Sequence, residues 1–148
     1  MDTQELDTFL RANIKVQVAT AGKDGRPHLT TLFYIVLDDG RIAFWTYGRS
    51  QKIVNLERDP RITCLVEDGV DYFELRGASI TGSAEIVREH DRILEIGGAV
   101  AARMVGAGSV EDLGEIALDE IRRQAEKRVA VIVTPERVGT WDHRKMKG

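Results

Sequence analysis

The spacing of apolar residues predicts that much of the chain forms β-strands. In residues 14–21, Val16 and Val18 alternate with Lys15 and Gln17, which is the period of a strand with one buried face. Further β-type runs follow, separated by turn residues or by helical segments. They predict strands at residues 28–37, 41–46, 61–66, 72–76, 78–87 and 129–133.

The first three strands are joined by tight turns, so we expect an antiparallel sheet. Asp24-Gly25 and Asp38-Asp39-Gly40 are hairpin sequences that stand directly between these runs. Parallel strands would need long crossover connections instead. Gly82, inside the run 78–87, marks a bulge or bend. The predicted fold is mainly β with flanking helices, a barrel of six to seven antiparallel strands that closes around one core.

Three segments have helical spacing. Residues 3–11 place Leu6 and Phe9 on one face, and a second helix begins after Ser50 and stops at Asp59-Pro60. The third segment, about residues 89–127, is a helical insertion between the last two strands. We leave open whether it shapes a substrate pocket or packs around a dimer, and we favour the dimer.

Composition limits the class of protein. The length of 148 residues, with 43% hydrophobic and 30% charged residues, predicts a single globular domain over residues 1–148. A net charge of −3 argues against a nucleic-acid partner. There is neither a leader-like N-terminus nor an apolar run near the about 20 residues of a membrane span. We therefore expect a cytoplasmic protein with no membrane partner.

The sequence contains no recognisable catalytic motif. There is one cysteine, Cys64, which excludes an internal disulfide and lies in an apolar run typical of a buried thiol. His28, His90 and His143 are far apart in sequence, so we predict no metal site. Without an acid–base signature, we leave the catalytic residues unassigned and expect a bound cofactor to carry the chemistry.

The turn before the second helix is the strongest candidate for a binding site. Arg49 and Lys52 flank Ser50, which is a favoured N-cap residue for a helix that starts at Gln51. The free N–H groups of a helix N-terminus, together with two cations, suit a phosphate. On local chemistry alone, an ordinary capped surface helix with solvated bases explains these residues equally well.

Three segments in order resemble the pyridoxamine-phosphate-oxidase-like split β-barrel family. They are residues 24–31 (DGRPHLTT), residues 44–52 (FWTYGRSQK) and residues 55–61 (NLERDPR). Within that family, the sequence is most similar to the actinobacterial oxidoreductases that use the deazaflavin coenzyme F420. The resemblance covers roughly residues 8–88 and the final strand, and it moves the turn at Arg49 strongly towards a phosphate site.

The resemblance implies a homodimer with two cofactor sites in grooves between the subunits. It implies that the segment Ser50, Gln51 and Lys52 holds the cofactor phosphate, with Arg49 beside it. It also implies that Thr30, Thr31 and Leu32 form the wall on which the tricyclic ring lies, and that Thr46 and Tyr47 line the ribityl chain. Trp141 would be a tail aromatic residue that reaches the partner's site.

The implied function is a reductase that moves a hydride from reduced coenzyme F420 to an unsaturated or conjugated small molecule. An FMN-dependent oxidoreductase on the same barrel is the alternative, and a non-catalytic carrier of flavin or deazaflavin is the rival from another class. Tyr47 and His28 are candidate proton donors by their proximity to the matching strands alone. The tail from Trp141 to Lys145 does not reproduce the arginine–histidine signature that holds pyridoxal phosphate, so oxidation of pyridoxamine phosphate is not expected.

Overall fold

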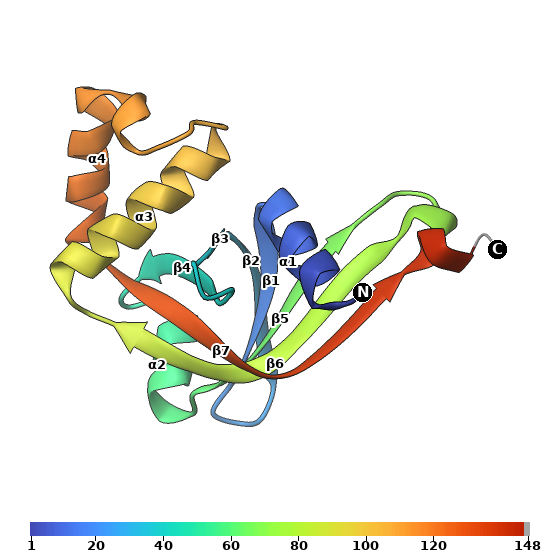
Figure 1. Cartoon of the computed structure of the whole chain (residues 1–148). Helices are drawn as coiled ribbons and strands as arrows, with labels where there is room; N and C mark the ends of the chain where they lie inside the picture. The colour runs from blue at the N-terminus through green and yellow to red at the C-terminus, as the bar shows by residue number, and fades with distance from the viewer. Residues whose placement is uncertain (147–148) are drawn as a thin grey trace.

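The computed structural model describes residues 1–146 and shows one curled, seven-stranded antiparallel sheet (Figure 1). Its strands are β1 Lys15–Ala21, β2 Pro27–Phe33, β3 Ile35–Val36, β4 Ile42–Tyr47, β5 Arg61–Asp68, β6 Arg76–Val87 and β7 Arg128–Asp142. The spatial order is β2-β1-β5-β6-β7-β4-β3, and every pairing is antiparallel. The prediction of a mainly β, antiparallel barrel is confirmed.

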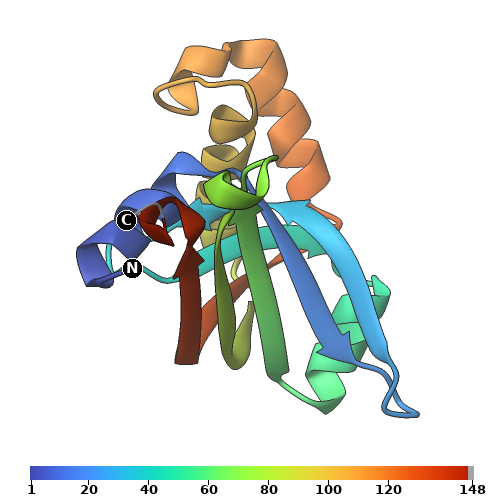
Figure 2. The same ribbon diagram turned by 90° about the vertical axis from the view of Figure 1, so that its right-hand side faces the viewer.

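Four α-helices and three short 3-10 turns flank this sheet in residues 1–146. They are α1 Thr3–Ala12, α2 Gln51–Arg58, α3 His90–Met104 and α4 Glu115–Ala125, with short 3-10 turns η1 Tyr72–Glu74, η2 Glu111–Leu113 and η3 His143–Met146. In Figure 1, α3 and α4 stand together at one end of the molecule, and the seam of β6 and β7 runs from them towards the C-terminus. Figure 2 shows α1 beside that seam, on the side where both chain ends lie.

Two apolar cores lie on the two faces of β4 and β7. Phe44 and Val131 point into the barrel core. The next residue on each strand, Trp45 on β4 and Ile132 on β7, packs against α3 and α4 in a second core. Because both faces are covered there, β4 and residues 129–133 of β7 are nearly continuous apolar runs that do not alternate with polar residues. The helical insertion therefore packs on its own chain's sheet. Cys64 lies in the barrel core, and burial raises the pKa of its thiol to about 12.

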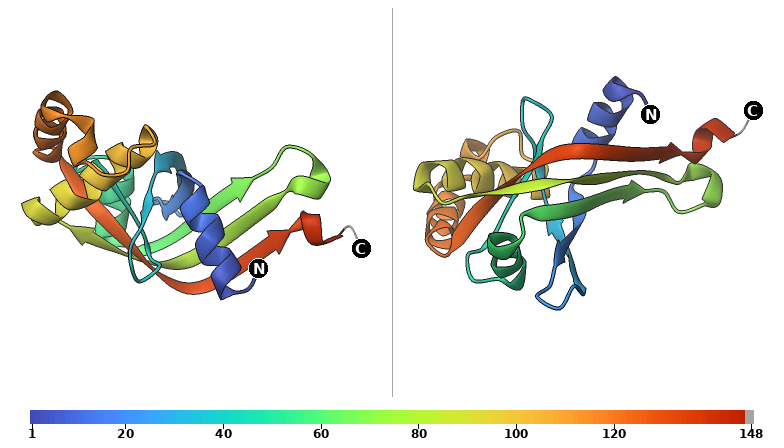
Figure 3. Two further views of the ribbon diagram at one scale, coloured as in Figure 1. Left: turned by 45° about the horizontal axis from the view of Figure 1, so that its top comes forward. Right: turned by 90° about the horizontal axis from the view of Figure 1, so that it is seen from below.

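The last strand is longer than the sequence predicts. Pro135 is a stop signal two residues after the predicted strand at residues 129–133, yet β7 continues to Asp142 alongside β6 (Figure 3). The register shifts between Thr81 and Gly82, and Gly82 is the partner of Pro135. The irregular pairing at this bulge lets the ladder continue past a residue that has no N–H to donate. The predicted bend at Gly82 is confirmed.

Two other strand predictions are corrected. The run 28–37 forms two strands, because the chain leaves β1 at Tyr34, whose buried hydroxyl donates to the Leu10 carbonyl at 2.5 Å, and then pairs with β4. The run predicted at residues 72–76 is not a strand of its own, because only Arg76 is in β6. Tyr72 and Phe73 lie in η1 with exposed side chains, so their apolar character does not indicate burial in a sheet.

Within residues 1–146, no helix has the length and apolar character needed to cross a membrane.

Candidate functional site

The basic turn connects β4 to α2 and borders a cavity of about 750 Å³. We call it the turn cavity. The backbone N–H of Gly48 donates to the carbonyl of Lys127 at 2.9 Å, which fixes the turn against the start of β7. Lining this cavity are Tyr47, Gly48, Arg49, Ser50, Glu126, Lys127, Arg128 and Val129. The predicted phosphate turn is thus hollowed on the side that faces β7.

Ser50 has the backbone of an N-cap residue, but its side chain does not cap the helix. Its φ and ψ are −65° and 156°, and its hydroxyl makes no capping hydrogen bond. The Oγ atom is buried and has no hydrogen-bond partner among residues 1–146. A buried polar atom without a partner costs free energy unless a ligand or water completes it. The hydroxyl at the N-terminus of α2 therefore fits a bound anion.

Lys52 is buried beneath the turn, with 7% of its surface exposed. Its Nζ atom donates to Oγ1 of Thr46 at 3.1 Å, and an ammonium group carries three donors, so two remain for other acceptors. Burial, and secondly the positive charge of Arg128, lower the pKa of Lys52 below its ordinary value of 10.5. An anion bound next to the Lys52 ammonium would offset both effects.

We expect the affinity for a phosphate-bearing ligand to fall as the pH rises towards 10.5, because Lys52 loses its proton at a lower pH than an ordinary lysine does. Calorimetric titration with FMN between neutral and alkaline pH measures this. A Lys52→Met variant should lack this decline. A wild-type affinity that stays constant over the whole range would contradict the assignment of Lys52 to the phosphate.

Arg128 is a functional candidate that the sequence analysis missed. It opens β7 and pairs in register with Tyr47. Its guanidinium carbon lies 4.7 Å from the ring centroid of Trp45 and 4.3 Å from that of Tyr47. Its Nε atom is buried without a hydrogen-bond partner, and no ion pair among residues 1–146 includes it. A cation that lies over two aromatic rings and has no anionic partner in the described residues is available to an anion.

A second cavity, of about 480 Å³, lies between the sheet and the helical insertion. We call it the apolar cavity. It is lined by the end of β2, by Trp45, and by side chains of α3, η2 and α4. Arg128 lines both this cavity and the turn cavity. The two cavities are therefore neighbours that share Arg128 as a lining residue.

The remaining predicted site residues differ in whether they lie at a cavity and whether their polar atoms are free to bind a ligand. Thr31 and Leu32 line the apolar cavity. Oγ1 of Thr30 and Nδ1 of His28, from the same strand, are buried and lack partners within residues 1–146. Gln51, in contrast, donates its side-chain amide along the helix to Asn55 at 2.9 Å, so it is already engaged.

Trp141 lies apart from the other predicted site residues of its own chain. It is near the far end of β7 from Arg128 and packs against Gly77, where an added Cβ would come within 2.1 Å of the indole ring. Its assignment to a cofactor site stays a prediction that requires a second subunit.

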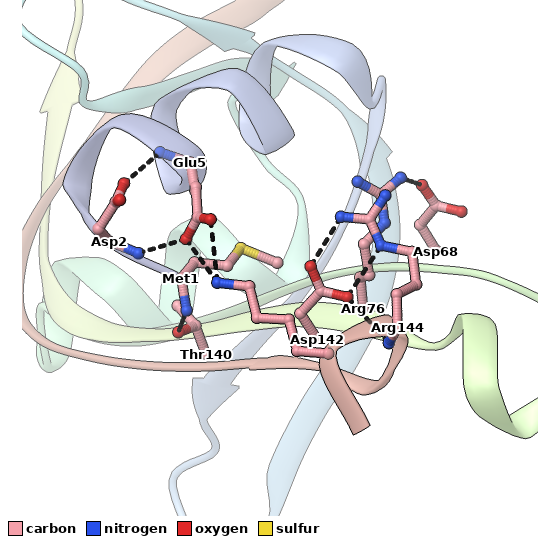
Figure 4. Close-up of polar contacts among 9 residues, drawn as sticks. Met1, Asp2, Glu5, Asp68, Arg76, Thr140, Asp142 and Arg144 are labelled. Carbon is pink, nitrogen blue, oxygen red and sulfur yellow. Dashed lines mark hydrogen bonds and ion pairs between the residues drawn. The ribbon is translucent and has the colours of Figure 1, made fainter. Parts of the chain in front are cut away.

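The polar tail after Trp141 is held within its own chain. Arg144 binds the carboxylate of Asp142 at 2.7 Å and lowers its pKa to about 2. Lys145 binds Glu5 at 2.9 Å, and the His143 ring contacts a backbone carbonyl of η1. Figure 4 shows the Asp142–Arg144 pair beside the start of the chain. These basic groups already have partners, so they do not form an open phosphate site in one subunit.

No group of three or more His, Cys, Asp or Glu side chains within residues 1–146 is arranged to hold a metal ion.

A known family model matches most of the chain. The family model described as pyridoxamine 5'-phosphate oxidase matches residues 2–142. A comparison with curated protein sequences finds no match.

Solved structures share the fold. The conserved hypothetical protein Rv2991 from Mycobacterium tuberculosis is 39% identical, with a TM-score of 0.89 over 99% of this chain and 88% of that one. An F420 reductase is 18% identical, with a TM-score of 0.62 over 90% of this chain and 94% of that one. HutZ, the heme storage protein from Vibrio cholerae, is 22% identical, with a TM-score of 0.66 over 95% and 93%. At these identities the last two show a common fold alone.

Proposed function

The chain belongs to the pyridoxamine 5'-phosphate oxidase family, and on that premise we propose that it is a cytoplasmic oxidoreductase that uses coenzyme F420. Its reaction would transfer a hydride to an unsaturated or conjugated small molecule. The observation that carries this proposal is the unpartnered, buried Ser50 hydroxyl at the N-terminus of α2, next to the cations Arg49 and Lys52.

The residues of the turn suit the phosphate of such a cofactor. Lys52 has two donors left beside the one given to Thr46, and the hydroxyl of Ser50 supplies another. Arg49 is exposed and belongs to none of the ion pairs among residues 1–146. The first N–H groups of α2 lack partners inside the helix and add a partial positive charge. Together these groups would bind and orient a phosphate.

The two cavities suggest how the rest of the cofactor would lie. From a phosphate in the turn cavity, Tyr47 and then the wall of β2 at Thr31 and Leu32 would line the path of the ribityl chain and the ring. When bound, the deazaflavin ring supplies or accepts the hydride. The chain's own part is to hold the ring in place and, with the apolar residues above β2, to keep water away from it.

A homodimer would complete this site. Trp141 lies at the far end of β7, so it would contact a cofactor through the partner subunit's groove. The basic tail residues are engaged within their own chain, which supports the prediction that pyridoxamine phosphate is not the substrate.

Titration of the purified protein with coenzyme F420 and with FMN tests the proposal. We expect saturable binding of the deazaflavin, with weaker binding of FMN, and oxidation of the reduced deazaflavin by at least one acceptor in a panel of conjugated ketones and quinones. Tighter binding of FMN would favour the FMN-dependent alternative. Binding without turnover of any acceptor would favour the carrier, and absence of binding of either cofactor would contradict the proposal.

A further inference from the structure

We propose that the apolar cavity binds a flat, largely apolar molecule that carries a single acidic group, and that Arg128 holds this group. That the molecule is the substrate of the enzyme rests on the proposed function. The predicted affinity of the cavity for such a molecule is independent of the proposed function, because the affinity follows from the lining and the charge of the cavity itself.

The lining selects an apolar body. Phe33 and Trp45 present aromatic rings, and Val100, Met104 and Ile121 present aliphatic or thioether surface from α3 and α4. The volume of about 480 Å³ falls in the range of small-molecule sites, which is about 300–1,000 Å³. Flat conjugated rings gain contact area and stacking against such aromatic walls.

The walls of the cavity are held close together by the insertion. Helix α3 lies so close to Trp45 that a Cβ on Gly97 would come within 2.3 Å of the indole ring. On the same helix, Gly98 faces Val110, at 2.9 Å from the position of an added Cβ. This close packing fixes the aromatic wall on which Arg128 rests.

The charge of the cavity is positive and uncompensated. Glu120 lines it, but its carboxylate binds Arg123 at 2.5 Å and accepts a bond from Gln124 at 3.3 Å. Arg128 is the other charged residue of the lining, and it has no anionic partner among residues 1–146. A neutral ligand would bury this cation further without pairing it, whereas an acidic ligand pairs it.

Two fluorescent probes that differ by one acidic group test this inference. They are 1-anilinonaphthalene-8-sulfonate and its neutral counterpart N-phenyl-1-naphthylamine. In the wild-type protein we expect the sulfonate to bind about tenfold more tightly, which is the gain from one charge-assisted contact. Equal affinities, or no binding of either probe, would overturn the proposal.

Three variants locate the probe. Arg128→Gln should remove the preference for the sulfonate while the neutral probe still binds. Ala117→Trp, which fills the cavity from α4, should weaken both probes. Arg122→Gln is the matched control, because Arg122 lies on the outer surface of α4 in an ion pair with Asp119, and it should change neither affinity. A preference that survives Arg128→Gln, or binding that survives Ala117→Trp, would place the probe elsewhere and refute the site.

Saturating deazaflavin separates this inference from the proposed function. The deazaflavin ring would lie along Thr31 and Leu32, which form one wall of the apolar cavity, and a hydride acceptor has to bind beside the ring. We therefore expect the sulfonate to remain bound in the presence of the deazaflavin. Displacement would mean that the ring occupies the apolar cavity, and the inference would be wrong. If the deazaflavin does not bind at all, the proposed function fails, and the probe titrations still decide the inference.

Discussion

Replacing Lys52 with methionine should weaken the binding of a phosphate-bearing cofactor about 30-fold. Lys52 is a buried ammonium with two donors free for a phosphate, and a hydrogen bond to a charged group contributes about 2 kcal/mol. Equilibrium titration of the variant with the cofactor measures the loss.

The fold should not suffer from this change. Methionine keeps the length and apolar stem of the side chain and removes a charge whose burial is costly, so thermal unfolding should begin no earlier than in the wild type. Lys23→Met, on the exposed turn between β1 and β2, is the control for loss of a positive charge. If Lys52→Met binds the cofactor as tightly as this control, Lys52 does not hold the phosphate.

Replacing Gly82 with alanine should lower the free energy of unfolding by about 2 kcal/mol or more. An added Cβ would lie 2.1 Å from the carbonyl oxygen of Thr134, a backbone atom that cannot swing aside as a side chain does. The bulge between β6 and β7 would have to open at the point where β7 passes Pro135. Urea unfolding, followed by circular dichroism, measures the change.

Gly139→Ala is the matched control on the same pair of strands. No atom lies within 4 Å of the position of its added Cβ, so this substitution should be neutral or slightly stabilising. A similar loss of stability in both variants would mean that the close approach at Gly82 is not the cause.

The sequence predicts the sheet well where local chemistry decides the structure. Val16 and Val18 point into the barrel core as their alternation predicts, and the turn at Gly25 joins paired strands. The helix after Ser50 begins at Gln51 and ends at Arg58, where Asp59-Pro60 stops it. In each case the signal lies within a few residues of the element it defines.

The errors arise where distant partners decide the structure. Pro135 is a sound stop signal for a strand, and only the irregular pairing opposite Gly82 lets β7 continue. Arg128 carries no motif of its own. Its importance comes from pairing with Tyr47 across more than 80 residues of chain and from the two aromatic rings beside it. The signal in the sequence is the cation at the start of the closing strand. Pairing that strand with the one that ends in Tyr47 would have placed Arg128 beside the basic turn.

The most direct test of the phosphate turn compares coenzyme F420 with its chromophore lacking the phosphate and the groups beyond it. Both carry the same ring and ribityl chain, so the comparison isolates the part that the turn at Ser50 and Lys52 would bind. We predict that the intact coenzyme binds the wild-type protein about 30-fold more tightly. In Lys52→Met most of this difference should disappear. Equal affinity of the wild-type protein for the two compounds would contradict the account.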